Sequence, residues 1–141
     1  MEKKIDWVVH MVMNGANCDV CGKREDELIP YACDAHTHGM NNYGHKEFQM
    51  VLAYEPKELM RILNYLGLKV QAGEKFSDGD MVSGIYLDCD VQLREFECHG
   101  DTVLRVIIPD RMNRFPDNPD CEEILKIQLF KTDDLYIKNL S

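Results

Sequence analysis

The chain has 141 residues, of which 45% are hydrophobic and 29% are charged, values close to those of ordinary globular domains. That length suits a single domain, residues 1–141, with a proper hydrophobic core. The net charge of −9 argues against binding to nucleic acid or to anionic membranes. No apolar stretch approaches the roughly 20 residues that cross a bilayer, so we expect a soluble protein.

The cysteines indicate the compartment. The chain has 6 cysteines, but its first residues, MEKKIDWVVHMVMNG, do not read as a secretory signal. Asp6 and His10 interrupt the apolar run, and no small-residue cleavage site follows it. Thiols in such a chain are expected to stay free, to bind metal or to do redox work in a reducing compartment, so we expect a cytoplasmic protein.

Three segments in the first half of the chain predict strands. The first, residues 5–13, ends at Asn14 and alternates at period two. Segments 31–38 (YACDAHTH) and 47–54 (EFQMVLAY) are the other two. The apolar residues on one side of the first segment are Ile5, Trp7, Val9 and Met11.

One helix is predicted over about residues 56–72. Pro56 suits a first helical turn, Glu58 favours the positive helix start, and Gly73 ends the pattern. The apolar stripe is Leu59, Ile62, Leu63, Leu66 and Val70. Four strand-like runs follow: VSGIYL, VQLREFE, TVLRVIIP and ILKIQLF. The sequence therefore predicts an α+β fold with a mainly antiparallel sheet and one principal helix.

A cluster of cysteine and histidine predicts a zinc site. Cys18 and Cys21 form a CxxC pair, and Cys33, His36 and His38 follow it. The intervening loop is polar and without periodicity, and metal ligation worth on the order of 10 kcal/mol can order such a segment. We therefore expect an N-terminal loop organised by zinc, with the three thiols and one of the two histidines as ligands.

Strand geometry leaves an alternative open. In a regular strand His36 and His38 share one face while Cys33 points to the other. Either a bulge or bend at Asp34 and Ala35 brings Cys33 round, or the cysteines take a fourth ligand elsewhere while the histidines form a separate polar site.

The remaining cysteines and a redox role are weaker candidates. Cys89, Cys98 and Cys121 lie in or beside turns and can supply a distant thiolate, although free cysteines are commonly small buried apolar groups. A redox CxxC usually begins a helix, whereas the residues after Cys18 and Cys21 show no amphipathic pattern.

A second constellation suggests catalysis. His36, His38 and His45, with Glu47 as the base, can form a metal-dependent hydrolase site with an open coordination position. The plainer alternative is that these side chains are hydrogen-bonded within the turn or lie on a solvated face.

Residues 36–130 resemble the bacterial domain-of-unknown-function family 4262. The stretches that carry the resemblance are HTHGM, YGHKEF, LNYLGLKVQAGEKFSDGD and RVIIPDRMNRFPD. The positions that match are His45, Glu47, Gly73, Phe76, Gly79, Asp110, Arg114, Phe115 and Pro116. The family has Tyr and Val where this chain has His36 and His38, and Pro where it has Lys46, so the resemblance does not support the metal site.

The resemblance implies a polar pocket and names no reaction. The candidates to line it are His45 and Glu47 beside one strand and Asp110, Arg111 and Arg114 in the late loop, with Arg114 holding an anionic group and His45 moving a proton. Internal ion pairing of Asp110 with Arg114 is the alternative.

The sequence leaves three functions open, one of which is a redox or thiol-switch protein. The first is a cytoplasmic zinc-binding domain with a structural metal and a pocket for a small molecule or a protein partner. The second is the hydrolase, so whether the protein is an enzyme stays open.

Overall fold

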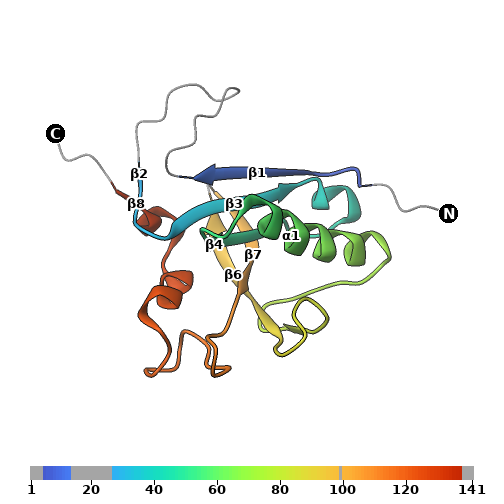
Figure 1. Ribbon diagram of the computed structural model, residues 1–141. Helices are drawn as coiled ribbons and strands as arrows, with labels where there is room; N and C mark the ends of the chain where they lie inside the picture. The colour runs from blue at the N-terminus through green and yellow to red at the C-terminus, as the bar shows by residue number, and fades with distance from the viewer. Residues whose placement is uncertain (1–4, 14–26, 99, 138–141) are drawn as a thin grey trace.

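A six-stranded mixed sheet and one principal helix form the α+β fold that the sequence predicts (Figure 1). This computed structural model describes residues 5–13, 27–98 and 100–137. The strands are antiparallel to their neighbours except β4 and β7, which run parallel. In sheet order they are β1 (Val8–Met13), β3 (Ala32–His38), β4 (Phe48–Leu52), β7 (Asp101–Ile107), β6 (Val91–Cys98) and β5 (Met81–Val82).

Helix α1 (Pro56–Gln71) covers one face of the sheet and buries the predicted apolar stripe. Its buried side packs on core residues of β3, β4, β6 and β7, so the main core lies between helix and sheet. Gly67 lies in that stripe because the ring of Trp7 approaches it: a Cβ there would meet Trp7 Cζ2 at 2.5 Å. Trp7 also donates its indole N–H to Asn64 Oδ1 at 2.9 Å, which joins the start of β1 to the helix.

The other face of the sheet is covered by the C-terminal segment. This segment consists of two 3-10 helices, η2 (Glu123–Leu129) and η3 (Thr132–Leu135), and the short strand β8 (Tyr136–Ile137), which pairs with β2 (Glu27–Leu28). A smaller apolar cluster lies beneath it: Leu28, Ala32, Val51 and Leu135. The middle of this second face is therefore buried, and its buried groups are largely polar, whereas Val8 and His38 on the same face are exposed.

Two of the predicted strands are wrong. Of VSGIYL, only Val82 belongs to a strand, and ILKIQLF forms the 3-10 helix η2. The reason in the second case is Gln128, whose buried side chain accepts the N–H of Ile108 at 2.7 Å and donates to its carbonyl at 2.9 Å. A side-chain amide thus takes the place of strand pairing just after the end of β7.

The predicted zinc-organised loop, with Cys18 and Cys21, lies outside the described residues. Among the described residues, no helix combines the length and apolarity that crossing a membrane requires.

Candidate functional site

Three histidines meet where β1 pairs with β3. His10 lies directly opposite His36 in the antiparallel register, and His38 is two residues further along the same face of β3. The Nε2 atoms of His36 and His38 form a hydrogen bond of 3.0 Å, in which one ring donates and the other accepts. The ring centroid of His10 lies 5.3 Å from that of His36 and 6.0 Å from that of His38. The structure therefore brings together the two predicted histidines and adds a third.

The spacing of these rings suits a transition metal ion. Zinc binds imidazole nitrogen at about 2.0–2.1 Å, which in a tetrahedral site places neighbouring donors roughly 3.3 Å apart and their ring centroids roughly 5 Å apart. The Nε2 atoms of His36 and His38 are close to that separation already.

Asp34 holds His36 in the orientation that a ligand needs. The carboxylate is fully buried and accepts from His36 Nδ1 at 3.3 Å, from Gln49 Nε2 at 3.2 Å and from the Tyr136 hydroxyl at 2.7 Å. Burial favours the neutral acid, but the hydrogen bonds from His36 and Tyr136 outweigh it and hold the pKa of Asp34 well below its usual range. A proton on Nδ1 leaves the lone pair of His36 Nε2 facing His38, as in carboxylate–histidine–metal arrangements.

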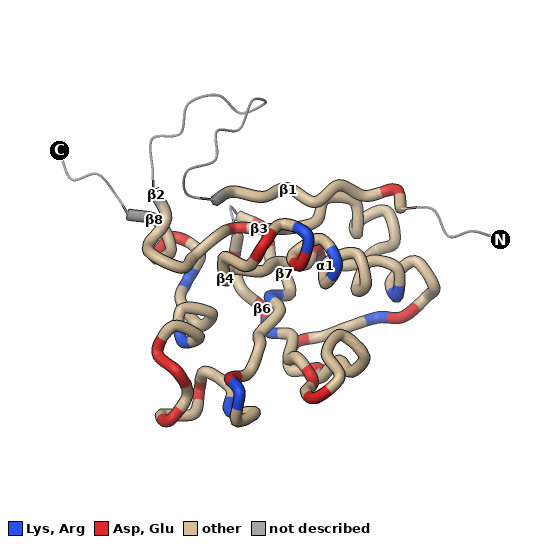
Figure 2. The backbone as a smooth tube through the Cα atoms, viewed as in Figure 1, with Lys and Arg blue, Asp and Glu red and all other residues tan. Residues whose placement is uncertain are grey.

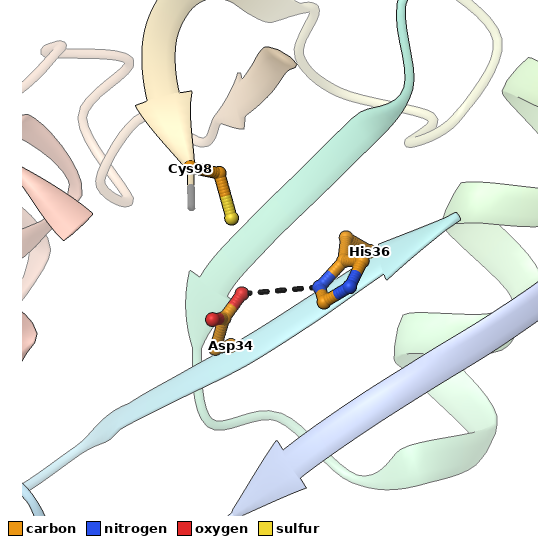
Figure 3. A group of neighbouring side chains, drawn as sticks. All are labelled: Asp34, His36 and Cys98. Carbon is orange, nitrogen blue, oxygen red and sulfur yellow. Dashed lines mark hydrogen bonds and ion pairs between the residues drawn. The ribbon is translucent and has the colours of Figure 1, made fainter. Parts of the chain in front are cut away.

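A second donor group shares His36. Asp34, His36 and Cys98 each place one ligand atom within 4.8 Å of the others (Figure 3). Burial, and then the charge of Asp34, raises the pKa of the Cys98 thiol to about 12, so this sulfur is protonated at neutral pH. Because both oxygens of Asp34 already accept hydrogen bonds, this group supports the histidines better than it binds an ion itself.

A buried arginine completes the layer beneath the histidines. Arg105 is fully buried and donates its Nε–H to Gln49 Oε1 at 2.8 Å. Its other nitrogens donate to the carbonyls of Gln128 and Phe130 and to the hydroxyl of Thr132. Burial lowers the pKa of Arg105 to about 10, which still leaves it charged at neutral pH. Its charge thus offsets that of Asp34 and fixes the C-terminal segment on the sheet.

The structure corrects the prediction for Cys33. Its side chain is 0% exposed, on the core face of β3 opposite the histidines, and its thiol donates to the carbonyl of Leu52 at 3.2 Å. Burial, and then the charge of Asp34, raises the pKa of Cys33 to about 12. A register shift against β4 does occur between Ala32 and Ala35, but it leaves Cys33 in the core. Cys33 as a co-ligand of His36 or His38 is therefore wrong.

The predicted catalytic pair is also placed elsewhere. The Nε2 atom of His45 accepts the N–H of Phe76 at 3.0 Å, and its Nδ1 donates to the Lys46 carbonyl at 2.7 Å. Both nitrogens of the imidazole are thus engaged in the turn. These two bonds tie His45 to Lys46 and Phe76, so the hydrolase arrangement of His45 with His36 and His38 stays a prediction.

Glu47 has a structural role for a similar reason. Its carboxylate accepts the hydroxyl of Thr37 at 2.8 Å and the N–H groups of Gly39, Met40 and Asn41. It therefore fixes the short 3-10 helix η1 (Met40–Tyr43) on the side of the sheet that faces the core. A carboxylate with this many donors is not a free general base.

The predicted ligand residues mostly pair with one another. Asp110 accepts the backbone N–H groups of Met112 and Arg114 and pairs with the Arg114 side chain at 2.9 Å, and Arg111 pairs with Glu122 at 3.0 Å. The alternative of internal ion pairing therefore holds for Arg114. Asp110 and Arg111 do line a surface pocket.

Comparison with known proteins gives no match among protein-family models, curated proteins or solved structures. The resemblance to family 4262 thus stays a prediction.

Sequence reasoning did not assign His10, Asp34 or Arg105 to the site. One signal in the sequence could have found His10. If the first two predicted strands pair in an antiparallel arrangement, His10 can lie opposite His36.

Proposed function

We propose that the protein binds a divalent transition metal ion, with zinc as the ion that suits its donors, on the face shared by β1 and β3. His36 and His38 are the paired ligands and His10 is the third. The observation that carries the proposal is the 3.0 Å separation of the two Nε2 atoms, with Asp34 fixing the proton on the far nitrogen of His36. Imidazole is a common ligand of zinc, copper and nickel.

The role that fits best is structural. The strand β1 is at the edge of the sheet, and an ion held by His10 from β1 and by two residues of β3 cross-links that edge. The carboxylates that hydrolysis would use are engaged in hydrogen bonds, Asp34 beneath His36 and Glu47 in the turn. We therefore favour metal binding over the alternative of a hydrolase.

The cytoplasm is the compartment we propose. The cysteines in the described part of the chain, Cys33, Cys89, Cys98 and Cys121, are all free thiols. Free thiols are the rule in reducing compartments. The further thiolates expected from Cys18 and Cys21 remain a sequence prediction, and variants of these two residues test it separately.

The test is the metal content of purified variants, measured by inductively coupled plasma mass spectrometry after reloading with zinc and desalting. We expect one zinc ion per wild-type chain and loss of that ion in His38→Ala, whose exposed side chain can be removed without harm to the core. His45→Ala removes an imidazole elsewhere, and Cys33→Ala removes a core thiol; both should keep the ion. A wild-type protein that retains no zinc, or a His38→Ala variant that retains all of it, contradicts the proposal.

A further inference from the structure

A surface pocket of about 540 Å³ lies between the start of α1, the segment from β5 to β6 and the segment after β7. Its walls come from Tyr54 and Glu58 at the start of α1, from Tyr86 and Asp88 between β5 and β6, and from the segment after β7 that includes Arg111. An adjoining hollow is also lined by Tyr86 and Asp88 and extends the pocket. Pockets of this size commonly accept small molecules.

The charge of this pocket is negative. Its lining contains three carboxylates, those of Glu58, Asp88 and Asp110, and one guanidinium, that of Arg111. The adjoining hollow adds Asp90 and no cation. Figure 2 shows acidic residues along the segment that leads from β5 to β6, on this side of the molecule.

Ion pairing within the protein does not cancel this charge. Asp110 pairs with Arg114, Arg111 with Glu122, and Glu58 with Arg61. Within the described part of the chain, Asp88 and Asp90 form no ion pair. The charge left over in the pocket and its extension is therefore that of two exposed carboxylates.

Two tyrosines give the pocket an aromatic wall. Tyr54 and Tyr86 are half-buried, and in the described part of the chain neither hydroxyl has a hydrogen-bond partner. Burial, and then the nearby Tyr54 and Glu58, raises the pKa of Tyr86 to about 12. The guanidinium of Arg61 lies 5.5 Å from the centroid of the Tyr86 ring, so this ring already contacts one cation of the protein itself.

We infer that this pocket binds a small organic cation, an amine whose ammonium group lies near Asp88 and whose apolar part packs on Tyr54 and Tyr86. Carboxylates attract the charge, aromatic faces contact it, and the free hydroxyls accept its N–H groups. The charge of this ligand is opposite in sign to that of the anionic ligand that the sequence suggested for Arg114. The reason for the difference is that the guanidinium of Arg114 is bound to Asp110. The inference does not depend on the metal site.

Three probes of nearly equal shape test the sign of the charge: benzylammonium, benzyl alcohol and benzoate, each titrated into ¹⁵N-labelled protein and followed by amide chemical shifts. We expect benzylammonium to shift the amides of residues 86–89 and 110–113 and to bind about fivefold more tightly than benzyl alcohol. Benzoate should leave these amides unchanged. Equal binding of the three probes, stronger binding of benzoate, or no shift with benzylammonium overturns the inference.

Matched variants separate a specific site from general attraction by an acidic protein. Asp88→Asn should weaken benzylammonium binding about fivefold, whereas Asp117→Asn makes the same change of charge on an exposed residue outside the pocket and should not weaken it. Tyr86→Leu should abolish binding while the remaining amide spectrum shows an intact fold. Equal weakening in Asp88→Asn and Asp117→Asn overturns the site, and tighter binding of a lysine-containing pentapeptide than of benzylammonium overturns the small-molecule assignment.

Discussion

Asp34 and Arg105 carry opposite charges in the same buried layer of the protein and are joined through Gln49. The Gln49 side chain donates to Asp34 Oδ1 at 3.2 Å and accepts from Arg105 Nε at 2.8 Å. The pairing of β4 with β7 sets this contact, since Gln49 and Arg105 lie opposite each other in the parallel register. The orientation of His36 therefore depends on a chain of hydrogen bonds that reaches the C-terminal segment.

Arg105→Lys tests that chain. A lysine has one ammonium group and cannot reproduce the planar set of donors that Arg105 directs at Gln49, Gln128 and Thr132. We expect the free energy of unfolding to fall by about 2–3 kcal/mol, because buried acceptors lose their donors. Urea denaturation of the wild type and of Arg105→Lys measures this loss of unfolding free energy.

Arg94→Lys is the matched control for this change. Arg94 lies opposite Arg105 on β6, but its side chain is 40% exposed and pairs only loosely with Asp78. We expect its effect to stay within about 0.5 kcal/mol, as is usual for surface substitutions. Equal losses in the two variants would show that the buried hydrogen bonds do not stabilise the fold as described.

Gly67→Ala tests the contact between helix α1 and Trp7. Alanine gains about 1 kcal/mol in helix propensity, but a Cβ at 2.5 Å from the buried indole forces a shift that typically costs about 1–3 kcal/mol. We expect a net loss of about 1 kcal/mol, together with a change in the fluorescence of the single tryptophan.

A second variant decides whether that loss comes from the indole. In a Trp7→Leu background the smaller side chain leaves room for the new methyl group, so Gly67→Ala should become neutral or stabilising there. The same loss in both backgrounds would mean that Trp7 is not the cause.

The acid dependence of stability should include a contribution from Asp110. Burial favours its neutral form, but the backbone and side-chain N–H groups of Arg114 outweigh it and lower the pKa of Asp110 from 3.8 to about 2. The folded state then binds its proton less readily than the unfolded state. The stabilisation is complete above about pH 4 and is lost as the pH falls through about 2.

Urea denaturation between pH 2 and 5 measures this contribution. We expect wild-type stability to fall more steeply over this window than that of Asp110→Asn, whose side chain cannot titrate. Asp117→Asn, which changes an exposed carboxylate, should follow the wild type. If the plots of unfolding free energy against pH are parallel for wild type and Asp110→Asn, the hydrogen bonds described for Asp110 in this loop do not lower its pKa.

The elements that could be predicted are those with a strong local pattern. Helix α1 buries a stripe at three- and four-residue steps, and β1, β3 and β4 alternate at period two or lie in apolar runs. ILKIQLF has an equally apolar sequence but forms a 3-10 helix, because the pairing with Ile108 is made by the Gln128 side chain. That contact spans 20 residues and leaves no local pattern.

The same distinction applies to the candidate site. His36 and His38 share a face through strand periodicity alone, and the same periodicity argues against Cys33. His10 joins them only through the register of β1 on β3, and Arg105 through the parallel pairing with β4. Such long-range pairings are set by the whole core and cannot be read from one segment.

The most direct test of the central claim is the ¹⁵N chemical shift of the histidine ring nitrogens during a zinc titration. We predict that Nε2 of His36 and Nε2 of His38 shift together and saturate at one equivalent of zinc, while both nitrogens of His45 stay unchanged. If the ring nitrogens of His36 and His38 do not respond to zinc, or respond no more than those of His45, the protein does not hold a metal ion at this face.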